Sequence, residues 1–312
     1  MARQHAAPRS LAHPRYWLTW LGIALLWLSA RLPQSARLAA GRALGALLYR
    51  LAHARRHITE VNIDLCFPER DADARRQLVK DVFAANAIGL LETALGWWGT
   101  DRQLQPLLRV EGLDQLKAAQ AEGRGVLLLG AHFTTLDLAG RLTCFCAPLD
   151  VIYRQSKNPV MDRLILNNRA KRFQHVIERS DIRQVLRSLK DGHIVWYAPD
   201  QDYGAKYSVF APFFGIPAAS ITATSRLARM NQSPVFFFSH YREADGHYRL
   251  AFTPLEAGFP ADDDVVNATV VNRIIERAIR QHPEQYMWVH RRFKTRPEGE
   301  PSFYRKKHKA RR

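Results

Sequence analysis

A histidine and an aspartate five positions apart are the residues of this sequence best suited to proton transfer. His132 and Asp137 lie in residues 130–137 (GAHFTTLD), directly after an apolar run over residues 126–130. A carboxylate that accepts a hydrogen bond from imidazole Nδ1–H fixes the tautomer and leaves Nε2 available as a base. Such a pair could remove a proton from a substrate hydroxyl, so we take His132 and Asp137 as the candidate catalytic residues.

The spacing of this pair restricts where the two side chains can meet. Within one helix, residues five positions apart point about 140° away from each other, so His132 must lie in a turn before the helix. Thr134 and Asp137 also match a capping box, in which Asp137 would bind only helix N–H groups. A second pair with the same spacing, His240 and Asp245, runs from an expected strand into a hairpin turn. The strand–turn–helix context favours the first pair, and the capping alternative stays open.

Three further polar segments could bind a substrate. The first contains Tyr153 and Arg154, followed by Asn158 and Asp162. The second is PDQDYG over residues 199–204, and the third is HRRFKTRP over residues 290–297. Loops rich in arginine, aspartate and asparagine suit a polyhydroxylated, phosphorylated ligand, although each alone could be an ordinary surface loop. The two aspartates at 200 and 202 could also hold a divalent metal ion. The candidate substrate-binding residues are Arg154, Asn158, Asp200, Asp202, Arg291 and Arg292.

Several other kinds of catalytic or metal site are not indicated. The sequence has no Gly-x-Ser-x-Gly elbow, no cysteine beside a histidine, and no Walker or Gly-x-Gly-x-x-Gly motif. Its three cysteines, Cys66, Cys144 and Cys146, form no disulfide framework and lack metal-ligand spacing. We therefore expect a reducing compartment, no structural zinc and no cofactor.

The elements that must position these residues follow from hydrophobic periodicity. The chain has 312 residues, of which 47% are hydrophobic, so wholesale disorder is excluded. Strands are expected over residues 126–130, 193–198, 235–241 and 248–253, and helices over residues 71–99, 112–121, 181–190, 220–230 and 267–281. Strands that alternate with helices, plus one hairpin, predict an α/β fold: a mixed, mainly parallel sheet flanked by helices.

An uncharged segment over residues 16–30 (YWLTWLGIALLWLSA) lies between arginines. A signal peptide is disfavoured because Ser29-Ala30, the candidate cleavage site, is followed directly by Arg31. A buried core helix remains an alternative, but tryptophans near both ends suit a membrane interface better. We expect a membrane-anchor helix over residues 16–32, with its flanking arginines on the cytoplasmic side. The helix expected over residues 36–57 is basic and amphipathic; it could lie on an anionic leaflet or be an ordinary surface helix.

The charge balance calls for an anionic partner. Lysine and arginine number 46 against 29 acidic residues, a formal charge of +17. Nucleic acid, an anionic membrane surface and a phosphorylated or acidic substrate are the candidate partner classes. No nucleic-acid-binding motif is present and the apolar N-terminal segment argues against that class, so we expect no nucleic-acid partner.

Taken together, these segments resemble the late (secondary) acyltransferases of lipid A biosynthesis, within the glycerolipid acyltransferase superfamily. The resemblance runs along nearly the whole chain. Its more specific parts are residues 195–204 (VWYAPDQDYG) and 283–301 (PEQYMWVHRRFKTRPEGEP), beside the His-x4-Asp of residues 132–137. The other matching parts are the N-terminal hydrophobic helix, residues 62–69 (NIDLCFPE), Glu92-Thr93 with Trp97, Tyr153-Arg154 with Asn158 and Asp162, and residues 210–214 (FAPFF).

The resemblance implies an O-acyltransferase that uses acyl-acyl carrier protein as donor. The acceptor would be a 3-hydroxyl on an acyl chain of the lipid A precursor that carries Kdo, and the acyl group laurate. His132 would be the general base and Asp137 its partner, with Arg154 contacting substrate or the developing oxyanion. The site would lie at the cytoplasmic face of the inner membrane, beside anionic lipid. A lysophospholipid or another glycolipid is the alternative acceptor.

This interpretation divides the chain into five parts. They are a basic tail over residues 1–15, the anchor helix over 16–32, a helical membrane-proximal segment over 33–109, the α/β acyltransferase core over 110–304 and a basic tail over 305–312.

Overall fold

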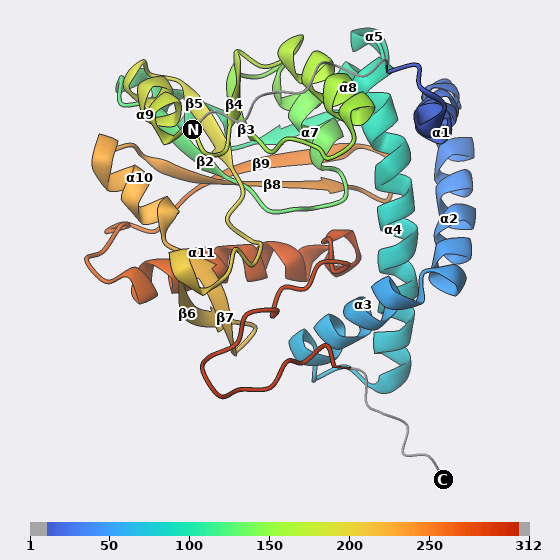
Figure 1. Cartoon of the computed structure of the whole chain (residues 1–312). Helices are drawn as coiled ribbons and strands as arrows, with labels where there is room; N and C mark the ends of the chain where they lie inside the picture. The colour runs from blue at the N-terminus through green and yellow to red at the C-terminus, as the bar shows by residue number, and fades with distance from the viewer. Residues whose placement is uncertain (1–10, 306–312) are drawn as a thin grey trace.

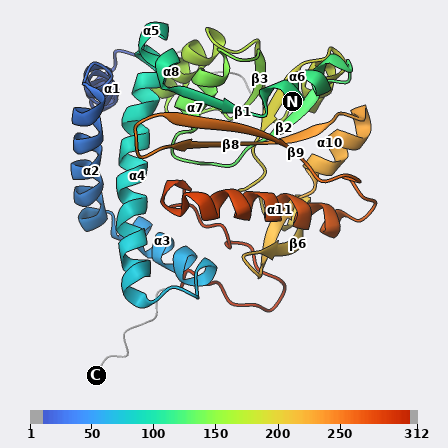
Figure 2. The same ribbon diagram turned by 180° about the vertical axis from the view of Figure 1, so that it is seen from behind.

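The computed structural model describes residues 11–305 of the chain. Most of the two expected basic tails, residues 1–10 and 306–312, therefore lies outside the described residues. Within the described part, helices surround a central twisted sheet (Figures 1 and 2).

The central sheet has seven strands in the order β1-β9-β8-β2-β5-β3-β4. Every neighbouring pair is parallel except the hairpin β8–β9, which is antiparallel. The mixed, mainly parallel sheet expected from the sequence is thereby confirmed. The strands are β1 (Leu108–Glu111), β2 (Val126–Leu129), β3 (Leu149–Tyr153), β4 (His175–Glu178), β5 (Ile194–Tyr197), β8 (Val235–Arg242) and β9 (Tyr248–Pro254). A separate antiparallel hairpin consists of β6 (Ser208–Phe213) and β7 (Ile216–Ile221).

Each face of the sheet carries its own apolar core. Successive residues of a strand point to opposite faces, so Leu127 and Leu129 of β2 pack with α11 on one side. Val126 and Leu128 pack with α6 and α7 on the other side. β2 is thus fully buried, which explains its unbroken apolar run. The helices that follow the first strand are α6 (Leu113–Ala121), α7 (Leu136–Thr143), α8 (Pro159–Ala170), α9 (Ile182–Lys190), α10 (Ala223–Asn231) and α11 (Asp264–Gln281).

The first part of the chain forms a helical layer at one end of the sheet. Its members are α1 (Trp17–Ser29), α2 (Gln34–Leu51), α3 (His53–Cys66), α4 (Ala72–Trp98) and the short α5 (Asp101–Leu104). In Figure 1 the long helix α4 stands against the sheet and α2 runs beside it. Gly41 and Gly45 permit this close packing, because a Cβ at either position would lie 2.5 Å from atoms of α4.

The helix expected over residues 36–57 is two helices. α2 ends at Leu51 and α3 begins at His53, because Ala52 leaves the helical region with ψ at 58°. Short 3-10 turns complete the described elements: η1 (Pro14–Tyr16), η2 (Gln105–Leu107), η3 (Ala205–Tyr207) and η4 (Pro283–Gln285).

The expected membrane-anchor helix over residues 16–32 is not supported. α1 has 13 residues, which at ~1.5 Å per residue is roughly 20 Å, short of a ~30 Å hydrocarbon core. Among residues 11–305, none of the helices combines the length and the apolar character that a membrane crossing requires. Ile23 of α1 instead belongs to a small apolar cluster with Tyr16 of η1 and Val160 of α8.

Candidate active site

The carboxyl ends of β2 and β5 place His132 and Asp200 side by side. The two strands are parallel neighbours in the middle of the sheet, so the loops that follow them meet at the same edge. His132 Nδ1 lies 2.6 Å from Asp200 Oδ1. The imidazole is 23% exposed and the carboxylate 1% exposed. This arrangement leaves Nε2 of His132 as the ring atom available to a substrate.

Two further donors fix the Asp200 carboxylate. Its Oδ2 accepts the backbone N–H of His132 at 2.9 Å and the hydroxyl of Tyr286 at 3.0 Å. Charge-assisted hydrogen bonds of this kind are stronger than neutral ones and hold the acceptor in one orientation. Asp200 therefore fixes both the ring and the backbone of His132.

The segment after η4 is tied to the loop that carries His132. Phe133 and Tyr286 form an isolated antiparallel bridge. Thr134 N–H donates to Gln285 O at 2.7 Å, and Met287 N–H donates to His132 O at 2.9 Å. Backbone contacts on both sides thus support the histidine.

The charges of the pair stabilise each other's ionised form. Burial disfavours the imidazolium, but the Asp200 charge and hydrogen bond outweigh this and raise the pKa of His132 above its ordinary value. Burial alone would raise the pKa of Asp200, yet His132 and the hydrogen bonds to the carboxylate keep that pKa below its ordinary value. An ionised Asp200 beside a histidine of raised pKa is the electrostatic arrangement of a proton acceptor.

Asp137 is not the hydrogen-bond partner of His132, in contrast to the expectation from spacing. Its Oδ1 lies 3.4 Å from Arg169 Nη2, and its Oδ2 accepts from Thr93 Oγ1 at 3.5 Å. The physical reason is that α7 begins at Leu136, so Asp137 belongs to the first helical turn and faces α4 and α8. Its charge still contributes to the raised pKa of His132, after the contributions of Asp200.

The structure also tests the helix-capping alternative for Asp137 and the second His-x4-Asp pair, His240 and Asp245. Thr135 is the N-cap of α7 and makes no side-chain capping bond, so the capping box is absent. Its hydroxyl instead contacts His240 Nδ1 at 2.8 Å. His240 is buried, which lowers its pKa to about 3, while Asp245 pairs with Arg109 in the hairpin turn. The second His-x4-Asp is therefore not a site.

A cavity of about 160 Å³ opens beside His132. Its lining combines the His132–Asp200–Tyr286 group with a cationic wall. The cationic wall residues are Arg291, Arg292 and Lys294. His290 also lines the cavity, but burial lowers the pKa of its imidazole and disfavours the charged form. A neutral base next to cationic side chains suits the deprotonation of a hydroxyl on an anionic substrate.

A smaller and more apolar cavity of about 40 Å³ lies between α7 and the sheet. Its lining includes Asp137 and Arg169, so these two residues line a different cavity from His132. The remaining lining is largely apolar: Leu136, Gly140, Leu149, Val151, Phe173, Trp196 and Phe238.

Comparison with known proteins identifies the family to which this site belongs. The profile of a family described as "Bacterial lipid A biosynthesis acyltransferase" matches residues 5–295. The chain belongs to this family. It is 42% identical over 297 residues to the lipid A biosynthesis lauroyltransferase of Escherichia coli K12, which covers 95% of this chain and 97% of that protein. The similarity of this lipid A biosynthesis acyltransferase to that relative therefore spans nearly the whole length of both chains.

Other relatives are named for the transfer of different acyl groups. The lipid A biosynthesis palmitoleoyltransferase of Escherichia coli K12 is 40% identical over 298 residues, covering 95% of this chain and 97% of that protein. The lipid A biosynthesis myristoyltransferase of the same organism is 29% identical over 306 residues, covering 96% and 94%. Identity thus sets this acyltransferase closer to the first two relatives than to the third.

The structure gives the remaining candidate residues of this acyltransferase different surroundings. Asn158 is the N-cap of α8, accepting from Val160 and Met161 N–H, and its amide donates to Thr19 Oγ1 of α1 at 2.9 Å. It is not brought to the cavity. Arg154 is exposed, and among the described residues no hydrogen bond or ion pair is found for it.

Asp202 and the two arginines do reach the cavity. Asp202 is buried and accepts from Thr295 N–H at 2.6 Å and Thr295 Oγ1 at 2.8 Å, so it holds the C-terminal segment in place. Arg292 is also buried and donates to Ala219 O at 2.9 Å. Arg291 is exposed at the cavity.

Sequence reasoning missed Tyr286 and His290. Both lie in residues 283–301, which resembled the family as a segment, but only its arginines were selected as binding residues. The position of Tyr286 against Asp200 depends on the bridge to Phe133, for which the local sequence has no signal.

Proposed function

We propose that this acyltransferase moves a fatty acyl group from acyl-acyl carrier protein to a 3-hydroxyl of the lipid A precursor, with His132 as general base. The hydrogen-bonded His132–Asp200 pair in a cationic cavity is the observation that carries this proposal. Asp200, rather than Asp137, orients the base.

The proposed reaction balances with side chains alone. His132 Nε2 takes the proton of the acceptor hydroxyl as its oxygen attacks the thioester carbonyl. The C–S bond then breaks, and the proton passes from the imidazolium to the departing thiolate. A positioned base contributes typically ~10²–10⁴-fold, and the thioester is already activated. Asp200 stabilises the imidazolium that forms between the two proton transfers.

The cationic wall of the cavity supports an acceptor and a donor that both carry negative charge. Arg291 and Lys294 are exposed there, and Arg292 lies behind them. Such groups bind phosphates or carboxylates and speed the approach of an acidic partner. Phosphate and Kdo groups of the precursor, and the acidic surface of the carrier protein, fit this requirement. Arg154 stays a candidate contact for substrate.

Laurate is the proposed acyl group. The relative at 42% identity is named a lauroyltransferase, and the apolar cavity beneath α7 offers a place for the start of a hydrocarbon chain. The palmitoleoyltransferase is nearly as similar, so the acyl group must be tested directly. The test offers the protein a mixture of acyl-acyl carrier proteins with acyl chains of different length and identifies the transferred chain by mass spectrometry.

A membrane surface is the proposed location of the reaction. α1 exposes Leu18 at 83% and Leu25 at 59%, and α2 exposes Leu51 at 64%. Arg42 and Arg50 of α2 are also exposed. Apolar side chains flanked by arginines suit an in-plane contact with anionic lipid. We place this contact at the cytoplasmic face of the inner membrane, where the carrier protein would meet a membrane-embedded acceptor.

The test is acyl transfer by the purified full chain with lauroyl-acyl carrier protein and the Kdo-bearing precursor. We expect wild-type protein to add one acyl chain and His132→Ala to lose about 10²-fold or more of that rate while keeping its melting temperature. Near-normal transfer by a folded His132→Ala protein would remove the proposed base. Acylation of a lysophospholipid in place of the precursor would favour the alternative acceptor.

A further inference from the structure

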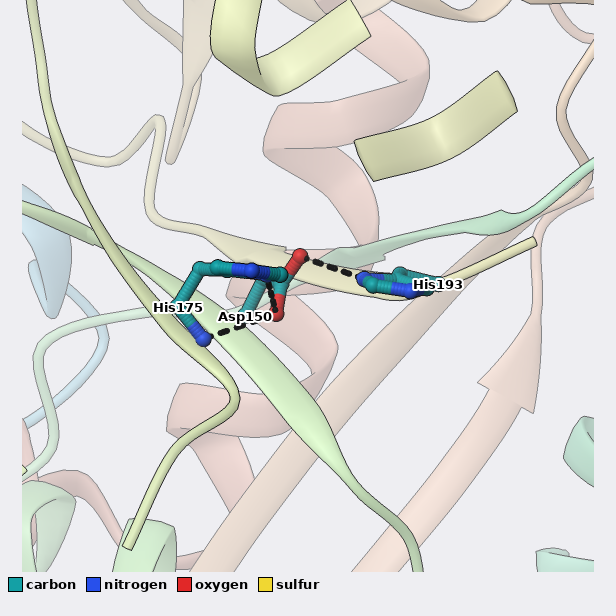
Figure 3. A group of neighbouring side chains, drawn as sticks. All are labelled: Asp150, His175 and His193. Carbon is teal, nitrogen blue, oxygen red and sulfur yellow. Dashed lines mark hydrogen bonds and ion pairs between the residues drawn. The ribbon is translucent and has the colours of Figure 1, made fainter. Parts of the chain in front are cut away.

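Two histidines and an aspartate meet at the edge of the sheet opposite the catalytic pair. Asp150 lies near the start of β3, His175 is the first residue of β4 and His193 directly precedes β5 (Figure 3). These strands are parallel neighbours in the order β5-β3-β4. His132 and Asp200 follow the carboxyl ends of their strands, whereas this cluster lies at the amino ends. The cluster is therefore separate from the acyl-transfer site.

The carboxylate at the centre of this cluster is fully buried. Asp150 is 0% exposed and accepts from His193 Nδ1 at 2.9 Å, from His175 Nδ1 at 3.1 Å and from the His175 backbone N–H at 3.0 Å. Over residues 11–305 its ion-pair partners are these two imidazoles, with no lysine or arginine among them. A buried carboxylate needs a compensating positive charge.

The donor atoms are arranged as metal ligands are. One ligand atom from each of the three residues lies within 4.8 Å of the others. The two imidazoles contact different oxygens of the carboxylate: His175 Nδ1 lies 3.1 Å from Oδ1 and His193 Nδ1 lies 2.9 Å from Oδ2. Bonds of about 2.0–2.2 Å from Zn²⁺ to nitrogen and oxygen place neighbouring ligand atoms roughly 3 Å apart, close to both separations. The two rings lie parallel at a centroid distance of 5.4 Å, with both Nδ1 atoms turned toward the carboxylate.

The site is also accessible from solvent. The His175 side chain is 48% exposed and that of His193 is 23% exposed, while Asp150 closes the inner side. A metal ion can therefore approach past His175 and keep water in its fourth position. Binding of the ion would replace the two Nδ1–H hydrogen bonds to Asp150: each neutral imidazole would then carry its proton on Nε2 and direct the Nδ1 lone pair to the ion.

We propose that Asp150, His175 and His193 form a binding site for Zn²⁺. Two imidazoles and one carboxylate are a donor set that zinc accepts, and the ion supplies the positive charge that the buried carboxylate lacks. The ion joins the edge strand β4 to β3 and β5, so its role is to stabilise the sheet. This site differs from the sequence-based expectation of no metal, which considered the cysteines and the pair Asp200/Asp202.

The test is zinc binding by the full chain, stripped with a chelator and titrated with Zn²⁺ by calorimetry. We expect one Zn²⁺ to bind wild-type protein and to raise its melting temperature by several degrees. His175→Gln, which changes a half-exposed side chain and should fold normally, should weaken that binding at least about tenfold and abolish the thermal shift. Substitution with Co²⁺ should give a visible absorption spectrum in wild-type protein that His175→Gln lacks.

The matched control is His247→Gln. His247 Nδ1 also lies near an aspartate, 3.2 Å from Asp245 Oδ1, but no second imidazole joins that pair in the described part of the chain. His247→Gln should keep the binding and the thermal shift of wild-type protein. The proposal is overturned if wild-type protein binds no Zn²⁺, or if His175→Gln binds it as tightly as His247→Gln does.

Discussion

At the scale of single residues, hydrogen bonds from neighbouring residues fix the orientation of His132, the proposed base. The imidazole of His132 receives its orientation from Asp200, and Asp200 is held by Tyr286 and by the His132 backbone. Asp137 is near enough to influence the charge of the ring but binds Arg169 and Thr93. The two aspartates therefore have different partners, and substitutions can test whether they contribute differently to the reaction.

Asp200→Asn should impair acyl transfer far more than Asp137→Asn. An amide in place of the buried carboxylate no longer stabilises the imidazolium and can impose the wrong tautomer, which costs about 10²–10⁴-fold in kcat. Asp137→Asn should lower kcat by less than about tenfold. Steady-state kinetics of both variants, with melting curves to show that each is folded, makes the comparison. Equal losses in two folded variants would contradict the assignment of Asp200.

The pH dependence of kcat/KM offers a second test of the pair. His132 must be neutral to accept a proton, so the rate should rise with pH through the pKa of His132, which lies above its usual 6.5. The Asp200 charge is the main cause of the raised pKa of His132. Asp200→Asn removes that charge and should move the acidic limb of the profile to lower pH. A limb that stays at the same pH in Asp200→Asn would show that another group controls it.

At the scale of elements, the long helix α4 determines how closely the catalytic loop can approach the helical layer. Gly89 of α4 faces the loop after β2, and a Cβ at this position would lie 2.4 Å from the carbonyl oxygen of Thr134. That carbonyl belongs to backbone, which cannot give way without moving the loop. Gly89 thus connects helix packing with the position of His132.

Gly89→Ala should therefore destabilise the protein and slow the reaction. The clash should cost about 1–3 kcal/mol, more than the ~1 kcal/mol that alanine gains over glycine in a helix. Gly22→Ala in α1 is the matched control, because a Cβ there has nothing within 4 Å. Thermal melting and kcat of the two variants give the measurement. An unchanged kcat and melting temperature in Gly89→Ala would contradict the close contact.

Elements with a strong local pattern were predictable from the sequence, and those set by tertiary contacts were not. The helices expected over residues 71–99 and 181–190 match α4 and α9, each of which begins after an aspartate N-cap. The break at Ala52 has no glycine or proline to mark it. The short edge strand β4 has only two apolar residues between polar ends, and its pairing with β3 could not be derived from periodicity.

In the candidate site, too, local sequence patterns were predictable and contacts set by the tertiary structure were not. The two loops that carry His132 and Asp200 were both selected, because each follows a buried apolar run. Their partnership depends on β2 and β5 being neighbours in the sheet, which is a property of the topology and not of spacing along the chain. Asn158 was selected for its polarity, and its local role as a helix cap was overlooked.

At the scale of the whole molecule, exposed apolar side chains concentrate on the outer helices. Trp17, Leu18 and Leu21 of α1 are exposed at 64%, 83% and 57%, far from the usual pattern of a buried apolar face. A contiguous exposed apolar surface on a folded protein marks a site of contact with a membrane or a protein partner. This exposure supports the proposed contact of α1 with lipid.

Substituting this surface should release the protein from vesicles. Leu18→Asp with Leu25→Asp should weaken binding to phosphatidylglycerol-containing vesicles by about tenfold or more, because burying each leucine contributes roughly 1.5–3 kcal/mol. Ile182→Asp is the control, since Ile182 is 44% exposed on the distant helix α9. Vesicle flotation measures the bound fraction. Equal flotation of all variants would exclude α1 as the contact surface.

The bridge between Phe133 and Tyr286 also has a consequence for biosynthesis. The base lies before the middle of the chain, but the hydroxyl that holds its carboxylate partner is translated 154 residues later, as the numbers 132 and 286 show. At ~5–20 residues per second, the ribosome needs roughly 10–30 s between the two. The loop that carries His132 therefore lacks this bridge, and Asp200 lacks the Tyr286 hydrogen bond, until late in synthesis. We expect a chain that ends before Tyr286 to show no turnover.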